Sequence, residues 1–128
     1  MATINRIMLM GNVSRDIALR FTTPGDPVLN VAMAVHRRVR GANGRSEDRT
    51  AFVEVTFFGR AAEILAERLH KGDLFYCEGQ IDQIERTVNP GKPNERQERK
   101  TAIIGSEFQL MPPREGRGGK HDPAPVQP

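Results

Sequence analysis

Apolar and polar side chains alternate most regularly in two stretches of the chain, residues 28–38 and 50–59. Successive side chains of a strand point to opposite faces of a sheet, so a period of two predicts a β-strand in each stretch. In the first stretch, one face holds leucine, valine and methionine, whereas the other holds small and polar groups. The small Ala32 and Ala34 would leave that second face low, like the floor of a groove.

The two faces of the stretch 50–59 differ in chemistry. One face is wholly apolar and is expected in the core; it consists of Ala51, Val53, Val55 and Phe57. The other carries Phe52 and Phe58 near its ends, with Glu54 and Thr56 between them. This mixed face would make a poor core surface, but it suits a flat, polar ligand. We interpret it as a platform for nucleic acid.

Four shorter patterns predict the remaining strands, at residues 5–13, 18–22, 73–83 and 101–111. Gly11 interrupts the first of them, where it marks either a bend with a close backbone approach or the end of the strand. Residues 60–72 change to a helical period, with apolar side chains three and four positions apart. Lys71 and Gly72 are expected to end this helix, with the glycine as a left-handed cap.

Polar segments rich in glycine and proline separate these elements. Residues 24–26 predict a turn, residues 36–49 a flexible basic hairpin loop, and residues 86–100 a long mobile hairpin. Residues 112–128 lack an apolar period and are expected to be disordered. The chain is therefore divided into one folded domain, residues 1–111, and a tail.

Composition narrows the functional classes. The net charge of +3 permits a polyanionic partner without requiring one. A lone Cys77, expected as core filler, and the lack of a long apolar run predict a cytoplasmic protein without membrane association. His36, His70 and His121 are far apart, and no metal-binding pattern, nucleophilic triad or phosphate loop occurs. We expect neither an enzyme nor a cofactor.

The order of elements predicts an all-β fold. Five main strands with one short α-helix between strands 3 and 4, together with glycine-marked bends and long hairpins, match the five-stranded barrel of the OB-fold. A repeat array or a parallel doubly wound sheet would need more helices than this chain provides.

Several segments then resemble the single-stranded DNA-binding (SSB) family of bacteria. The resemblance covers residues 4–111, and its most specific part is FG-x-x-AE…L-x-KG…Y-x-EGQ, within residues 57–80. It implies a homotetramer that coats single-stranded DNA near the nucleoid, in replication, recombination or repair, with no enzymatic activity. A dimer is the other oligomeric state considered.

The chain departs from this family where bases usually stack. Phe58 matches the family's phenylalanine, and Phe52 stands where a tryptophan is usual. Val39 and Arg86 occupy the other usual tryptophan positions, and the chain has no tryptophan. Glu54 lies on the platform, where it is expected to repel phosphate. The end of the chain lacks an acidic, hydrophobic tip, which argues against recruitment of replication and repair enzymes and favours an auxiliary member.

Arginine is expected to replace part of the missing stacking, because its guanidinium stacks on bases and pairs with phosphate. The candidate residues for both kinds of contact are Phe52, Phe58, Arg37, Arg38, Arg40 and Arg86. The resemblance adds backbone contacts from Arg6, Arg20, Arg60 and Lys71. Binding should therefore rely more on charge than in relatives that bear tryptophan.

Two alternatives stay open. A primosomal replication protein of the PriB type is also an OB-fold, and it works as a dimer in replication restart. A structural oligomer is the second, in which Phe52 and Phe58 would pack at a subunit interface instead of binding a ligand.

Overall fold

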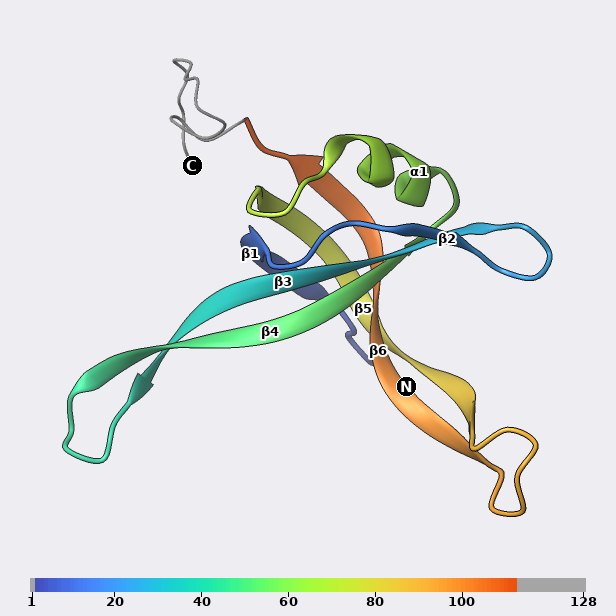
Figure 1. The fold of residues 1–128 in the computed structure, drawn as a ribbon. Helices are drawn as coiled ribbons and strands as arrows, with labels where there is room; N and C mark the ends of the chain where they lie inside the picture. Colours follow the sequence, from blue (N-terminus) through green and yellow to red (C-terminus); the bar gives the residue numbers. More distant parts are fainter. Residues whose placement is uncertain (1, 113–128) are drawn as a thin grey trace.

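The computed structural model describes residues 2–112, whose strands form one sheet that curls into a small barrel (Figure 1). The elements in chain order are β1 (Ile7–Val13), β2 (Leu19–Phe21), β3 (Pro27–Arg40), β4 (Ser46–Phe58), α1 (Gly59–Arg68), β5 (Leu74–Val88) and β6 (Arg96–Leu110). The strand order is β1-β5-β6-β4-β3-β2, and pairing of β1 with β3 closes the barrel. The predicted OB-fold is confirmed, with β2 as a short additional strand at the edge.

Gly11 lies where β1 passes from one partner strand to another. It pairs with Phe75 of β5, and the next residues of β1 pair with Ala34 and Met33 of β3. A Cβ at Gly11 would overlap the carbonyl oxygen of Ala34. Since β1 continues to Val13, the glycine marks a close backbone approach and not the end of a strand.

The core of the barrel contains three phenylalanines in contact. The ring of Phe57 lies 6.1 Å from that of Phe75 and 6.0 Å from that of Phe108, both edge to face. Gly105 of β6 makes room for them, because a Cβ there would overlap the Phe57 ring. Buried side chains of β3, including Leu29 and Met33, complete this cluster.

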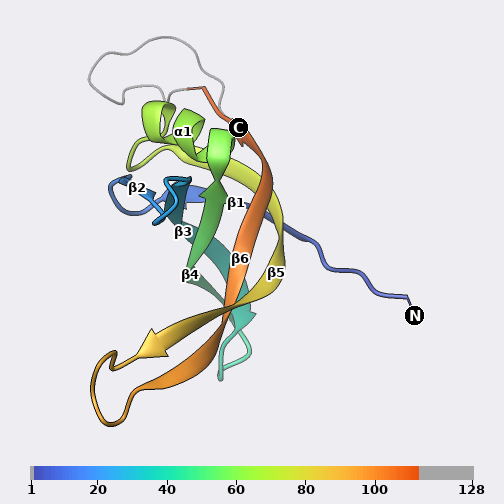
Figure 2. The same cartoon turned by 90° about the vertical axis from the view of Figure 1, so that its right-hand side faces the viewer.

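The helix α1 packs against β2, β3 and β4 at one end of the barrel (Figure 2). Its apolar side buries Ala62 and Leu65, as the helical period predicts. The predicted end of the helix was wrong, because Leu69 is already extended and the last helical residue is Arg68. Gly72 does adopt a positive φ of 94°, but it does so in the turn that follows the helix.

The two predicted hairpin loops, residues 36–49 and 86–100, are largely strand in the structure. The ladder between β3 and β4 continues to Arg40 and Ser46, and that between β5 and β6 continues to Val88 and Arg96. The two hairpins extend in different directions from the barrel (Figure 1). Their outer parts bury no face, so no apolar alternation marks them in the sequence, although backbone pairing makes them strands.

The sequence also makes predictions about Cys77, metal binding and membrane association. Cys77 is buried with its Sγ 3.9 Å from the Sδ of Met33, and burial raises the pKa of its thiol to about 11, so it is core filler. Within residues 2–112, no group of side chains is arranged to hold a metal ion, and no helix is long and apolar enough to cross a bilayer. His121 and the tail from residue 113 lie outside the described residues.

Candidate nucleic-acid interface

The outer face of β4 presents both predicted stacking residues to solvent. Phe52 is 72% exposed and Phe58 is 50% exposed, whereas Val55 and Phe57 between them are fully buried on the inner face. The two phenylalanines are six positions apart, a spacing of roughly 20 Å along an extended strand. The predicted division of this strand into a buried inner face and a solvent-exposed outer face is confirmed, and the role of the outer face as a platform stays a prediction.

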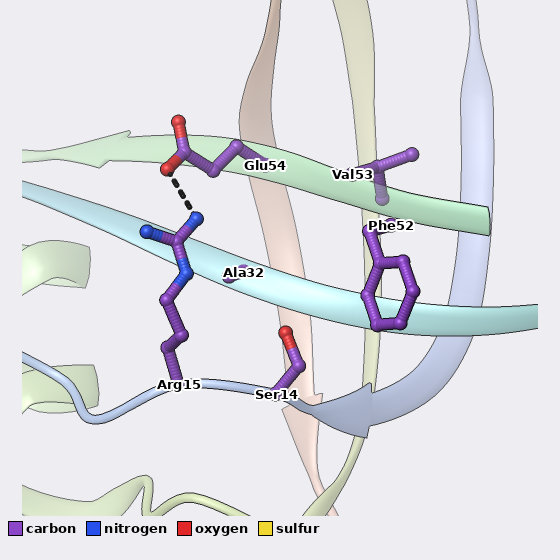
Figure 3. Close-up of a pocket in the computed structure, with 6 residues that line it drawn as sticks. All are labelled: Ser14, Arg15, Ala32, Phe52, Val53 and Glu54. Carbon is purple, nitrogen blue, oxygen red and sulfur yellow. Dashed lines mark hydrogen bonds and ion pairs between the residues drawn. The ribbon is translucent and has the colours of Figure 1, made fainter. Parts of the chain in front are cut away.

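A groove beside Phe52 has a volume of about 410 Å³. Its lining residues come from the segment after β1, from β3 and from β4, and they are Ser14, Arg15, Ala32, Phe52, Val53 and Glu54 (Figure 3). Ala32 pairs with Glu54 across the β3–β4 ladder, so its methyl group is the small floor that the sequence predicts. We call this space the Phe52 groove.

Glu54 has a partner that the sequence did not suggest. Nη2 of Arg15 lies 2.9 Å from its Oε2, and Figure 3 shows the arginine reaching across β3 to that carboxylate. The ion pair balances the charge of Glu54 and weakens the repulsion of phosphate that an isolated carboxylate would exert. Glu54 is therefore half of a charge-neutral pair on the platform.

A second groove, of about 550 Å³, lies beside Phe58. We call it the Phe58 groove. It shares Val53 and Glu54 with the Phe52 groove, so the two spaces adjoin on one surface. Its polar and cationic walls include Arg20, Asn30, Thr56 and Lys100. The Thr56 hydroxyl donates to Oδ1 of Asn30 at 2.8 Å, which fixes the asparagine amide beside Phe58.

The arginines of the β3–β4 hairpin divide between its two faces. Arg38 and Arg40 share the strand parity of Ala32 and Ala34, which pair with platform residues, whereas Arg37 lies on the opposite face. Arg38 is 3.4 Å from Asp48, and Arg40 donates to the carbonyl of Gly44 at 3.2 Å. The alternation in residues 28–38 already predicts Arg38 on the face of Ala32 and Ala34, although the candidate contacts include all three arginines.

The other predicted cations are spread over the molecule. Arg6 is 2.6 Å from Glu78, Arg60 is 3.3 Å from Glu63, and Arg86 is 3.7 Å from Glu98 on the β5–β6 hairpin. Lys71 follows α1 and is exposed. Of the ten predicted site residues, Arg20 lines the Phe58 groove together with Phe58. Arg86 lies on the β5–β6 hairpin, two positions beyond Ile84, which also lines that groove.

Glu78 lies in β5, between β1 and β6, and its carboxylate accepts two side-chain hydrogen bonds. The hydroxyl of Tyr76 donates to its Oε2 at 2.5 Å, and Arg6 donates to its Oε1. These contacts, that of Tyr76 above all, lower the pKa of Glu78, and the same hydrogen bond raises the pKa of Tyr76. Arg6 therefore already has a charged partner before any phosphate contacts it.

Sequence reasoning missed Arg15 and Lys100. Arg15 lies 39 residues before Glu54 in an irregular segment, so no local period could place it there. Lys100 was assigned to a mobile hairpin, but it belongs to β6, which runs beside the Phe58 groove. Both contacts join parts of the chain that only the closed barrel brings together.

Comparisons with known proteins agree with this geometry. The model of the single-strand binding protein family matches residues 4–111. A single-stranded DNA-binding protein of Xylella fastidiosa is 32% identical over 91% of this chain and 68% of its own length. One of Wolinella succinogenes is 36% identical over 60% of this chain and 48% of its own. The chain thus spans about half to two thirds of the length of these curated relatives.

A solved structure shares the fold. The structure described as Plasmodium falciparum SSB complex with ssDNA superposes with a TM-score of 0.71 over 88% of this chain and 98% of that one, at 21% identity. The OB barrel, the exposed aromatic platform and the family match over residues 4–111 lead to one assignment. This chain belongs to the single-strand binding protein family.

Proposed function

We propose that this protein binds single-stranded DNA without sequence preference, by stacking bases on Phe52 and Phe58 and by contacting phosphates with arginine. The observation that carries the proposal is the exposure of both phenylalanines on one face, each beside a groove with a cation in its wall. Every base has a π-face, so aromatic stacking tolerates any sequence. The relatives are named for binding single-stranded DNA, which supports the same ligand here.

Positive charge would supply the rest of the affinity. Arg20 has no carboxylate within 4.0 Å among the described residues, so it is available to a phosphate beside Phe58. Arg38 has a partner, but that ion pair is exposed, and such pairs exchange for phosphate at little cost. Arg37, Arg40, Arg6, Arg60, Arg86 and Lys71 are secondary contacts in this proposal, for a strand that continues beyond the platform.

The assembly and the cellular role form part of the proposal. One chain contains one barrel, so several binding surfaces require oligomerisation, and a tetramer is proposed with a dimer as the alternative. Such an oligomer would coat single strands near the nucleoid in the cytoplasm during replication, recombination or repair. The family match favours this function over that of a PriB-type primosomal protein.

The test is titration of fluorescently labelled oligo-dT with the wild type and with the Phe52→Ala, Phe58→Ala double variant. Loss of two stacking surfaces should weaken binding by about 2–6 kcal/mol per subunit. Affinity should also fall steeply with salt, with a log–log slope of about −0.7 for each phosphate contacted. Light scattering on the same samples reports the oligomeric state.

Phe21→Ala is the matched control. Phe21 is an exposed phenylalanine of β2 that lines neither groove, so its loss should leave affinity unchanged. Unchanged affinity in the double variant would remove the platform from the binding site. If the double variant instead changed the oligomeric state, the two phenylalanines would belong to a subunit interface. An affinity that hardly changed between low and moderate salt would contradict the role of charge.

A further inference from the structure

We propose that the Phe52 groove is a site for one base, in which the guanidinium of Arg15 is a third stacking surface and Glu54 is the residue that positions it. This assignment rests on the proposed function and deepens it. It names a contact from the segment between β1 and β2, and it explains the acidic residue in the middle of the platform.

The shape of the groove supports a flat occupant. Figure 3 shows Phe52 on one side and the Arg15 guanidinium on the other, with Ala32 on β3 between them. Both flanking groups are planar, and the floor is a single methyl group. The volume of about 410 Å³ lies within the roughly 300–1,000 Å³ usual for ligand sites.

The carboxylate of Glu54 fixes the guanidinium above this floor. The side chain of Arg15 is 68% exposed and that of Glu54 is 43% exposed, so the ion pair contributes at most about 1 kcal/mol to folding. Stability alone is a weak reason for a carboxylate on a surface that binds a polyanion. A guanidinium held in one orientation loses less conformational freedom when a base stacks on it.

The same pair separates stacking from charge. Because Glu54 balances the charge of Arg15, this arginine should add little to the attraction of phosphate. Its contribution to DNA affinity should come mostly from stacking of a base on the guanidinium plane. Arginine planes do serve as stacking surfaces for unpaired bases. The pair would thus supply part of the stacking area that a chain without tryptophan lacks.

The experiment compares Arg15→Ala, Arg15→Lys and Glu54→Gln by titration of labelled oligo-dT at several salt concentrations. Lysine keeps the charge but lacks the plane, so both Arg15 variants should bind roughly 5- to 10-fold more weakly than wild type, toward the low end of the range for one stacked base. Their salt slopes should match that of wild type. Glu54→Gln should weaken binding less, and in the Arg15→Ala background, where the carboxylate has lost its partner, it should cause no further loss.

An abasic oligomer of equal length gives a second readout. It retains the phosphates but lacks bases, so Arg15→Lys, which keeps the positive charge beside Glu54, should bind it as well as wild type does. Arg49→Ala is the matched control, because Arg49 is an exposed, ion-paired arginine on the opposite face of β4, 3.4 Å from Glu47. This variant removes one surface charge away from the groove, so its affinity for oligo-dT should stay close to that of wild type.

Three results would overturn the assignment while leaving the proposed function intact. Wild-type affinity for Arg15→Lys, with a reduced salt slope for Arg15→Ala, would make Arg15 a phosphate contact. Tighter binding by Glu54→Gln would make Glu54 a repelling group. Unchanged affinity in all three variants would leave the groove without a base. Failure of the wild type to bind oligo-dT would overturn the proposed function, and this assignment with it.

Discussion

Phe57 and Phe58 are neighbours in the chain and the same residue type, yet the structure places them in opposite environments. Phe57 is fully buried and its ring contacts those of Phe75 and Phe108. Phe58 is half exposed beside Arg20 and the Asn30–Thr56 pair. The strand has turned one side chain into the barrel and the next toward solvent.

This difference indicates that the two faces of β4 determine two separate properties, stability and binding. The inner face of β4 should determine stability, because burial of an aromatic side chain is among the larger favourable contributions to folding. The outer face should determine binding, because Phe52 and Phe58 are exposed to a ligand there. Since these side chains are already exposed in the folded state, unfolding removes little of their burial. Substitutions on the two faces should therefore affect different measurements.

The largest effect is expected at Phe57. Phe57→Ala removes the ring that joins β4 to β5 and β6, so the free energy of unfolding should fall by about 3–5 kcal/mol. Urea denaturation followed by circular dichroism measures this change. The DNA affinity of the fraction that stays folded should be close to that of wild type.

Phe58→Ala is the internal control for that experiment. It should leave the free energy of unfolding within about 0.5 kcal/mol of wild type, as is usual for surface positions. The two faces would not be separable if Phe58→Ala destabilised the protein as much as Phe57→Ala does.

A smaller effect is expected at Gly105. A methyl group there would overlap the Phe57 ring, which is confined by two other aromatic rings. Gly105→Ala should therefore cost about 1–3 kcal/mol of stability through overpacking. A combined Gly105→Ala, Phe57→Leu variant should recover part of this loss, since leucine gives the new methyl group more room. Additive losses in the combined variant would argue against direct contact as the cause.

The smallest effect is expected from Cys77, which lies beside the same core. Its folded pKa of about 11 exceeds the ordinary value of 9.0, so above pH 9 the unfolded chain loses a proton that the folded chain keeps. This contribution to stability is complete below pH 9 and decreases as the pH rises toward 11. Cys77→Ser should remove that part of the pH dependence, as measured by urea denaturation between pH 8 and 11. An identical pH dependence in the serine variant would show that other groups cause it.

The fold could be predicted largely from the sequence, because most strands bury one face. Alternation in 28–38 and 50–59 located β3 and β4, and the helical period located α1. The errors occur where no face is buried. The outer parts of both hairpins pair through backbone hydrogen bonds alone, and these leave no apolar pattern.

The site could be predicted only in part. Phe52 and Phe58 follow from strand parity, which is a local property. The division of Arg37 from Arg38 follows from the same parity within the predicted strand 28–38, but the candidate contacts included both faces. The groove cations Arg15, Arg20 and Lys100 come from three separate segments, so their proximity to the platform depends on strand pairing and on barrel closure.

The sequence by itself determined which side chains of β4 face the core and which face solvent, because neighbouring residues of a strand must point in opposite directions. Only the tertiary structure decided what lies beside the solvent face. Closing the barrel brings Arg15 across β3 to Glu54, and this contact changes an unexplained acidic residue into half of an ion pair. The physical reason is distance: alternation acts over a few residues, whereas this contact joins residues 39 positions apart.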